Sequence, residues 1–249
     1  MTTKKTQKDT ITRELQAWSV SELIDFMQEN NQKEPIHVTE KHGGKMSQMF
    51  SISTSPLCNP YCQARYNNNS KKKIPIICAW CFAHRQLERY VNNQPILEYN
   101  TTVLKKIIPI DFLPFIAVCN YKNYFRFESF GDLNNVEQVI NYFNICKKNQ
   151  HINFALWTKN YNFIAVAINK YGYKKPANLQ IIGSVAKINP SENEKAELLT
   201  RYDFINKTFS VYDSDTKANI NCGGKKCIEC GFCYDKKYKN IKHINELIK

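Results

Sequence analysis

The sequence contains no long hydrophobic segment. Its longest uninterrupted apolar run covers only the eight residues 76–83, whereas a membrane-spanning helix needs about 20 apolar residues in succession. Residues 1–5 include two lysines, but no apolar stretch follows them, so the N-terminus lacks the pattern of a secretory signal. We therefore expect a protein that does not contact a membrane and that works in the cytoplasm.

Three common catalytic motifs are also absent. The sequence has no G-x-x-x-x-G-K-[ST] phosphate loop, no H-E-x-x-H zinc motif and no G-x-S-x-G nucleophile elbow. This argues against a P-loop nucleotidase, a zincin protease and a serine hydrolase of the usual kind. The sequence alone assigns no catalytic residue.

Arginine is scarce in a chain that is otherwise basic. The formal net charge is +13, yet only six of the 35 basic residues are arginine and the other 29 are lysine. Arginine is the residue best suited to bidentate recognition of bases and phosphates. The composition therefore favours weak, salt-dependent attraction to polyanions over recognition of a particular nucleic-acid sequence.

Cysteine, by contrast, is abundant. The chain has ten cysteines in 249 residues, and eight of them fall into two tight groups. In the reducing interior of a cell, such groups bind a metal more often than they form disulfides. Cys119 and Cys146 stand alone, and we expect them to be small buried apolar residues.

The C-terminal group has the more specific spacing. It consists of Cys222, Cys227, Cys230 and Cys233. Four thiolates at such short intervals can close around one metal centre without a distant ligand. Structural zinc usually has two separated cysteine pairs, whereas C-x2-C-x2-C is typical of a [4Fe–4S] ligand set and C-x4-C-x2-C of plant-type [2Fe–2S] proteins. We favour an iron–sulfur cluster here, with zinc as the alternative.

The first group is less compact. It consists of Cys58, Cys62, Cys78 and Cys81, with fifteen residues between the second and the third. If three of them bind a [4Fe–4S] cluster, the fourth iron stays open to a small-molecule cofactor. If all four bind, the result is a structural zinc site. His84 closely follows Cys81 and is an alternative to Cys58 as a ligand.

Strand-like and helix-like segments alternate through the middle of the chain. The expected strands are residues 49–54, 124–130, 154–157, 179–185 and 209–212. Helices are expected at residues 82–93, 101–107, 135–148 and 161–171, and a solvated loop at residues 67–73. Strands separated by helices imply βα units and a largely parallel sheet. The predicted fold class is α/β, a partial (β/α) barrel or an open, mostly parallel sheet, with a C-terminal cysteine-rich metal-binding segment.

Polar residues follow several of the expected strands. In parallel βα folds, functional groups gather at the carboxyl ends of the strands. The first cysteine group follows the first strand, and five further candidates for cofactor binding follow the next two. They are Glu128, Gly131, Asp132, Thr158 and Lys159. The simpler alternatives for them are a helix N-cap and a solvated turn.

The chain divides into three expected regions. Residues 1–45 form a helical appendage and a linker, residues 46–215 an α/β core with the first cysteine group, and residues 216–249 the C-terminal four-cysteine segment. A capping box of Ser19 and Glu22 opens a short helix in the appendage. Its apolar face is expected to dock on the core.

Four motifs together are similar to those of one family. They are CAWCFA at residues 78–83, FRFESFGD at 125–132, ALWTKN at 155–160 and NCGGKKCIECGFCY at 221–234. With them the chain resembles the gene-product-88-like proteins of phages and mobile elements over about residues 45–245, with the N-terminal extension outside. The resemblance implies a phage-type protein in the cytoplasm of a bacterial host. It brings no established activity.

A more distant resemblance is to radical S-adenosylmethionine enzymes. Cys58-x3-Cys62 followed by Cys78-x2-Cys81 is similar to their C-x3-C-x2-C motif, split here by an insertion that departs from the family's spacing. The segment from Phe130 to Asp132 is similar to the Gly-Gly-Glu element that receives the amino group of the cofactor. The resemblance implies a [4Fe–4S] cluster, S-adenosylmethionine as cofactor and an auxiliary cluster on the C-terminal cysteines.

Two functions are therefore expected from the sequence. The first is an iron–sulfur protein with a radical-SAM-like core, an S-adenosylmethionine-dependent enzyme of unknown substrate. The alternative is a non-catalytic zinc-binding accessory protein that binds a nucleic acid or a host protein through its basic surface.

Overall fold

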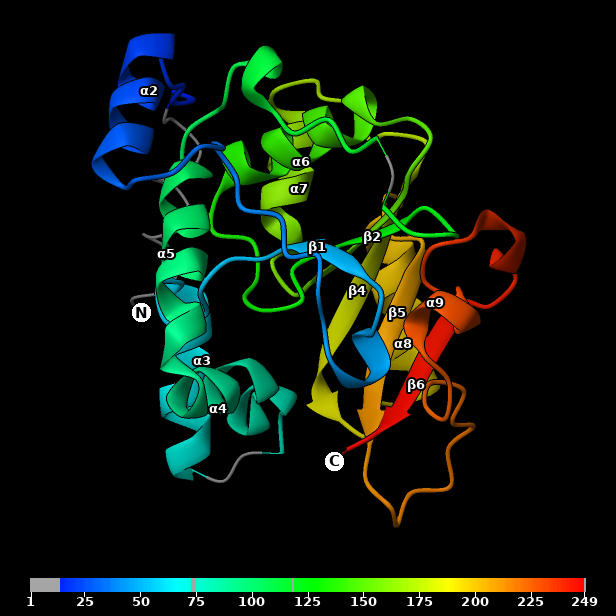
Figure 1. Ribbon diagram of the computed structural model, residues 1–249. Helices are drawn as coiled ribbons and strands as arrows, with labels where there is room; N and C mark the ends of the chain where they lie inside the picture. The colour runs from blue at the N-terminus through cyan, green and yellow to red at the C-terminus, as the bar shows by residue number, and fades with distance from the viewer. Residues whose placement is uncertain (1–13, 73–74, 118, 249) are drawn as a thin grey trace.

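The computed structural model describes residues 14–72, 75–117 and 119–248. At its centre is a six-stranded sheet in which all neighbouring strands are parallel (Figure 1). The strands are β1 (Phe50–Ile52), β2 (Tyr124–Phe127), β3 (Asn153–Thr158), β4 (Leu179–Ile188), β5 (Lys207–Tyr212) and β6 (His243–Leu247). The prediction of an α/β fold with a parallel sheet is confirmed. Strand β6 lies where the sequence predicts none.

The strands follow one another across the sheet in the order of the chain, from β1 to β6. A doubly wound sheet reverses its strand order at a switch point, and this sheet has no such reversal. Because βαβ crossovers are right-handed, sequential order brings the connecting segments to one face of the sheet. The opposite face is left for other parts of the chain.

Several helices surround the sheet. The α-helices are α2 (Val20–Glu29), α3 (Pro60–Lys72), α4 (Phe82–Arg89), α5 (Gln94–Val103), α6 (Val136–Lys148), α7 (Tyr161–Asn169), α8 (Glu192–Arg201) and α9 (Cys227–Cys230). Short 3-10 helices are η1 (Gly44–Met46), η2 (Ile77–Trp80), η3 (Val91–Asn93), η4 (Ile110–Phe112) and η5 (Lys236–Tyr238). Figure 1 shows α2, α5, α3 and α4 in a column beside the sheet, with the C-terminal segment on the sheet's other side.

Two of the predicted boundaries are wrong. Of residues 67–73, expected as a loop, residues 67–72 belong to α3, and residue 73 lies outside the described residues. That helix starts at Pro60 and is capped by Asn59, whose Oδ1 accepts the backbone N–H of Tyr61 at 3.0 Å, and its Asn- and Lys-rich end has only weakly unfavourable propensity. The helix expected at residues 101–107 lies earlier, as α5, with a proline in its first turn.

One face of the sheet packs against α6 and α7. Phe127 of β2 and Phe154 of β3 have no exposed surface, and neither does Tyr142 of α6. The ring of Phe127 stacks on both of the others, at centroid distances of 4.1 Å to Tyr142 and 5.1 Å to Phe154. Burying each of these rings contributes roughly 1.5–3 kcal/mol. This aromatic layer holds β2 and β3 against the helices.

We call the opposite face of the sheet the inner face. It carries the alternate residues of β2 and β3, among them Tyr124 and Ala155, which are buried in a second cluster with Ile228 and Tyr234 from the C-terminal segment. The rings of Tyr124 and Tyr234 stack at 5.1 Å. The cysteine-rich segment therefore covers part of the inner face.

The N-terminal helix docks on the core through part of its apolar face. The predicted capping box of Ser19 and Glu22 is present at the start of α2. Leu23 is completely buried in the main core, and the indole N–H of Trp18 donates to the carbonyl of Val103 in α5 at 2.8 Å. Val20, one turn before Ile24, is half exposed, so the docking uses only one edge of the helix.

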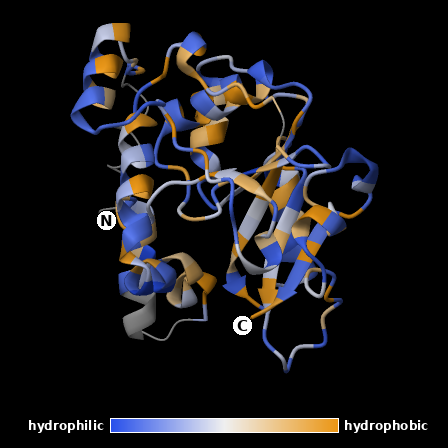
Figure 2. Ribbon diagram, in the orientation of Figure 1, coloured by the Kyte–Doolittle hydropathy of each residue, from blue (hydrophilic) through white to orange (hydrophobic). Residues whose placement is uncertain are grey.

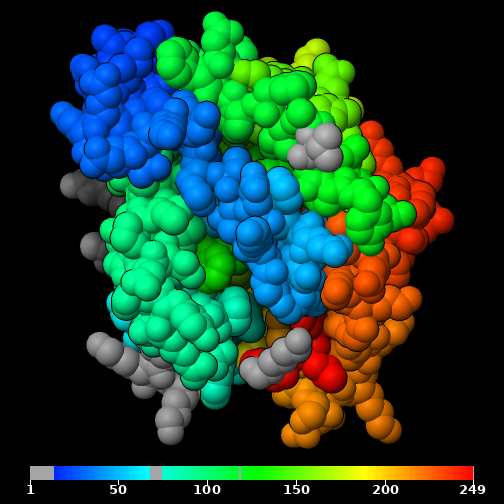
Figure 3. Space-filling view, in the orientation of Figure 1, coloured from blue at the N-terminus to red at the C-terminus, as the bar shows by residue number. Residues whose placement is uncertain are grey.

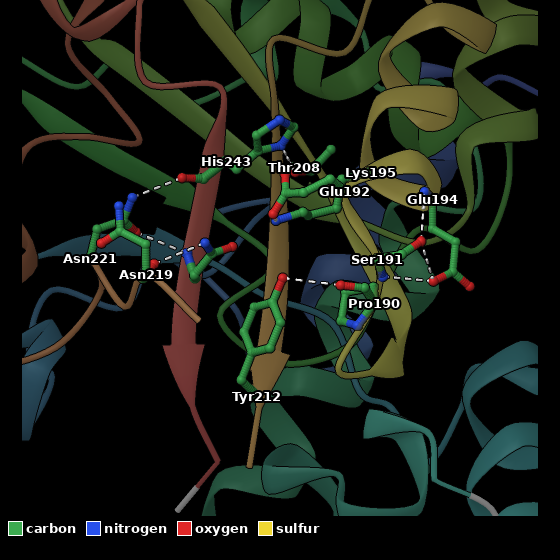
Figure 4. Close-up of polar contacts among 11 residues, drawn as sticks. Pro190, Ser191, Glu192, Glu194, Lys195, Thr208, Tyr212, Asn219, Asn221 and His243 are labelled. Carbon is green, nitrogen blue, oxygen red and sulfur yellow. Dashed lines mark hydrogen bonds and ion pairs between the residues drawn. The ribbon is translucent and has the colours of Figure 1, made fainter. Parts of the chain in front are cut away.

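Two asparagines fasten the start of the C-terminal segment to β6 (Figure 4). The amide of Asn221 donates to the carbonyl of His243 at 2.9 Å, and the backbone N–H of Asn245 donates to Asn221 Oδ1 at 2.9 Å. The Asn245 side chain in turn donates to the carbonyl of Asn219. These bonds fix the chain just before Cys222.

The hydropathy-coloured ribbon and the space-filling view agree with this arrangement. Apolar and polar residues alternate along the strands in Figure 2. In Figure 3 the region around residue 45 lies directly beside the C-terminal segment, although almost 180 residues separate them in the sequence. None of the described helices has the length and apolar character needed to cross a bilayer.

Candidate functional site

The carboxyl ends of β1, β2 and β3 meet in a buried polar network. Glu128, directly after β2, is only 3% exposed and has a φ of 57°. Its carboxylate accepts hydrogen bonds from Thr54 Oγ1 at 2.8 Å, from Gln138 Nε2 at 2.6 Å and from the Tyr142 hydroxyl. Burial raises the pKa of Glu128 to about 8, although these donors oppose the shift.

A second buried carboxylate, that of Asp132, joins β2 to β3. Its Oδ1 accepts the hydroxyl of Thr158 and its Oδ2 accepts the backbone N–H of Lys159 at 3.0 Å. Gly131 has a φ of 76°, and a Cβ there would lie 2.5 Å from the carbonyl oxygen of Thr54. Only glycine fits this close approach of two loops.

These contacts account for four of the five residues that were expected to bind a cofactor. Glu128, Asp132 and Thr158 are buried and bonded to protein groups, and Gly131 packs against Thr54. They form the floor on which the strand-end loops rest. The Lys159 side chain extends beyond this floor to the cysteines described next.

Three cysteines of the first group are coupled electrostatically to Lys159, and Cys62 is also coupled to the other two. Cys62 is in the first turn of α3, Cys78 is in η2, and Cys81 is the residue before α4. Burial raises the pKa of the Cys62 thiol; the Asp132, Cys81 and Cys78 charges raise it further, and Lys159 lowers it.

Lys159 belongs to the same cluster. Burial acts to lower its pKa, but the ionised forms of Cys78, Asp132, Cys81 and Cys62 raise it above its ordinary value. The ammonium group therefore interacts electrostatically with the buried carboxylate and with all three thiols.

Cys58 and His84, the other two candidate ligands of the first group, have different surroundings from Cys62, Cys78 and Cys81. The backbone N–H of Cys58 donates to the carbonyl of Ser55 in the turn after β1. His84 is 2% exposed, stacks on Tyr66 at 4.1 Å, and has no hydrogen-bond partner for either ring nitrogen in the described chain. Whether Cys58 or His84 belongs to the ligand set therefore stays a prediction.

All four cysteines of the C-terminal group line a single cavity of about 220 Å³. Cys222 is held by the bond from its N–H to the carbonyl of Asn245, and Cys227 and Cys230 are the first and last residues of α9. Gly231 ends α9 with a φ of 68°, and a Cβ at this position would lie 2.9 Å from the Tyr124 hydroxyl. The cavity is on the inner face of the sheet.

Positive charge surrounds this cavity. Lys45 Nζ lies 3.4 Å from Cys222 Sγ and pairs with Glu246. Burial raises the pKa of Cys227 and Cys233, and the Arg126 guanidinium lowers both. Arg126 lies on β2 beneath the segment.

Two buried donors beside the cysteines have no partner. They are the Nε of Arg126 and the hydroxyl of Tyr234, judged against the described residues. Four sulfur donors, nearby cations and unpaired N–H and O–H groups suit an anionic metal–thiolate centre, whose sulfurs accept hydrogen bonds. The residues present therefore fit such a group chemically.

The candidate ligands are not close enough together to form a metal site as they stand. Across residues 14–72, 75–117 and 119–248, no three histidine, cysteine, aspartate or glutamate side chains are grouped tightly enough to hold a metal ion. The metal predictions for both cysteine groups therefore stay predictions.

A family model, that of gene product 88, matches residues 24–243. The chain belongs to the gene product 88 family. The resemblance deduced from the four motifs is thus confirmed, but its extent is corrected, since the family begins within α2 instead of at the core. No curated protein and no solved structure matches the chain, so the likeness to radical S-adenosylmethionine enzymes has no support from these comparisons.

Proposed function

We propose that this member of the gene product 88 family is an iron–sulfur protein whose first cluster is held by Cys62, Cys78 and Cys81. The proposal is supported by the electrostatic coupling of all three thiols to Lys159, which follows β3 at the carboxyl edge of the parallel sheet. Three thiolates leave one iron of a [4Fe–4S] cluster without a protein ligand. That iron is open to a small molecule.

The position of the first cysteine group supports a catalytic metal centre rather than a metal ion that only stabilises the fold. In parallel βα folds, ligands bind at the carboxyl ends of the strands. A zinc ion that only stabilises a fold is normally enclosed by four protein ligands. Cys58, the remaining cysteine of the group, has its own place in the turn after β1.

The small molecule we propose at the open iron is S-adenosylmethionine. A reduced cluster would supply one electron for its reductive cleavage, which is the enzyme activity proposed here. The protein's own residues have simpler tasks. Lys159 balances the charge of the three thiolates, and Asp132 fixes the backbone at Lys159 through its Oδ2.

The C-terminal cysteines form the second centre of the proposal. Cys222, Cys227, Cys230 and Cys233 would hold a cluster with no open position. Arg126 and Lys45 would offset its negative charge, and the unpaired hydroxyl of Tyr234 would donate to it.

Metal analysis of the full-length protein purified without oxygen tests the proposal. We expect the unmodified protein to contain iron and acid-labile sulfide and to absorb visible light. Cys78→Ser should lose the first cluster and about half of the iron, whereas the matched variant Cys58→Ser should keep it. Colourless protein that carries only zinc, or equal loss from both variants, would overturn the proposal.

One observation favours a second function. Four thiols lining one cavity are also a complete ligand set for structural zinc. In that case both groups stabilise the fold, and the protein is a non-catalytic accessory factor whose net charge of +13 attracts a nucleic acid or a host protein. Zinc at both sites, salt-dependent binding to nucleic acid and no affinity for S-adenosylmethionine would establish it.

A further inference from the structure

A second cavity, of about 300 Å³, lies beside the first cysteine group. It is bounded by the start of α3, the turn between β3 and α7, the later part of β4, and α8. Its polar lining includes Tyr61, Arg65, Lys159, Tyr161, Ser184 and Arg201. These residues come from four separate parts of the chain, and the sequence alone did not connect them.

The lining of this cavity carries an excess of positive charge. Arg65 and Arg201 contribute two cations against two glutamates of α8, and Lys159 adds a third cation that also interacts with Asp132 and the first cysteine group. One of these, Glu194, is already engaged by the α8 capping box with Ser191 and by Lys187 at 3.0 Å. The charge of the cavity therefore suits an anion, and two of its three cations have the planar fork that matches a phosphate.

Aromatic rings form the apolar walls of the same cavity. Tyr161 and Tyr202 are in contact, with ring centroids 5.3 Å apart. The hydroxyl of Tyr161 donates to the carbonyl of Ser184, which fixes that ring against β4. On the opposite side the guanidinium of Arg65 lies 4.4 Å from the Tyr61 ring centroid. Such rings offer flat surfaces for a planar heterocycle.

The strand that forms the third wall is irregular at this place. β4 pairs with β5 at Ser184, and the next paired residue is Ile188, with the register shifted between them. Val185 and Ala186, within that interval, line the cavity. Bulges of this kind occur preferentially beside active sites, where they redirect the backbone.

We propose that this cavity binds a phosphate ester of mononucleotide size. The phosphate lies on Arg65 and Arg201, and the planar ring packs against Tyr161 and Tyr202. A volume of about 300 Å³ is at the lower end of known ligand pockets, which limits the ligand to a small molecule. The inference goes beyond the proposed function, because it requires neither a metal nor S-adenosylmethionine.

Binding measurements on the full-length protein test the proposal. The probes are adenosine 5′-monophosphate, adenosine and inorganic phosphate, each titrated calorimetrically at fixed salt. We expect the monophosphate to bind at least about tenfold more tightly than either part alone, because one charge-assisted contact to the phosphate is worth about that factor. Equal affinity for adenosine and its monophosphate would overturn the assignment.

Variants of single residues test whether the monophosphate binds in this cavity. Arg201→Gln should weaken monophosphate binding about tenfold and leave adenosine binding unchanged, while Tyr202→Leu should weaken both. The control is Arg89→Gln, which removes the same charge from an exposed site at the end of α4. If Arg89→Gln weakens binding as much as Arg201→Gln, the attraction is only that of a basic surface.

The iron content of the same samples keeps this result separate from the proposed function. Arg201→Gln and Arg89→Gln should both retain the metal of the unmodified protein, and circular dichroism should show that each is folded. Monophosphate binding by protein that holds only zinc would support the cavity assignment while the iron–sulfur proposal fails. Absence of binding at millimolar monophosphate by iron-loaded protein would overturn the cavity assignment alone.

Discussion

The guanidinium of Arg126 lies over the ring of Trp157, 3.9 Å from its centroid. The two residues belong to neighbouring strands, β2 and β3, and both face the C-terminal cysteines. Lys159, which is coupled electrostatically to the first cysteine group, comes two residues after Trp157, just past the end of β3. Strand β3 and the turn after it therefore carry residues of both candidate sites.

The first prediction concerns the charge that Arg126 places beside the C-terminal cysteines. Arg126→Gln should weaken metal retention by that group about 10- to 100-fold, the usual effect of losing a partner outside the ligand set. Competition with a coloured chelator measures the change. Arg89→Gln is the control for net charge, and an equal effect of both variants would contradict a local role for Arg126.

The second prediction concerns the pH dependence of stability at Glu128. Its pKa is about 8 in the folded protein, against an ordinary value of 4.5. The folded state therefore keeps a proton that the unfolded state releases above about pH 4.5. Stability from this group is fully present below that value and is lost as the pH rises towards 8, by at most about 1.4 kcal/mol per pH unit.

Urea unfolding at pH 5, 6.5 and 8 measures this effect. Glu128→Gln cannot ionise, so its free energy of unfolding should fall less with pH than that of the unmodified protein. Glu29→Gln, at the exposed end of α2, should follow the unmodified protein. Parallel profiles for the unmodified protein and Glu128→Gln would show that Glu128 is charged in the folded state.

The third prediction compares two glycines with similar backbone angles. Gly131 and Gly172 have φ values of 76° and 70°, but a Cβ on Gly172 would meet nothing within 4 Å. Gly172→Ala should cost only about 1 kcal/mol, the penalty of the left-handed conformation. Gly131→Ala should cost at least about 1 kcal/mol more, because the new methyl group collides with the Thr54 backbone. Chemical denaturation measures both, and equal costs would disprove the close approach.

The fourth prediction concerns metal removal. Because ligand sites of this kind order only when metal binds, a strong chelator should release residues 222–234 from the inner face. Hydrogen exchange of those amides should become faster, while α6 keeps its protection. Unchanged exchange after complete metal loss would mean that Ile228 and Tyr234 hold the segment by packing alone.

The regular parts of the fold were predictable because their patterns are strong. The apolar stripe of α6 and the capping box at Ser19 are each visible in a single window of sequence. Strand β6 was missed because its five residues mix polar and apolar types in a lysine-rich tail, and only pairing with β5 makes them a strand. The capping box of Ser191 and Glu194 was a signal for α8 that the sequence analysis overlooked.

The candidate sites were predictable to a lesser degree. Spacing identified the cysteine groups, since ligands close in sequence must be close in space. It ranked Cys58 behind Cys62, Cys78 and Cys81 as a ligand, and this ranking stays a prediction. The cavity with Arg65 and Arg201 was out of reach, since its walls lie more than a hundred residues apart and meet only through the register of β3 and β4.

The contact between Lys45 and Cys222 has a practical consequence for dissecting the molecule. Lys45 comes from the link between the N-terminal helix and the core, and its ammonium also pairs with Glu246 of the last strand. The cysteine-rich tail is therefore not an autonomous module that can be excised and studied by itself. A tail fragment would lack Lys45, Arg126 and the tyrosine beneath it, and would report on a different chemical environment.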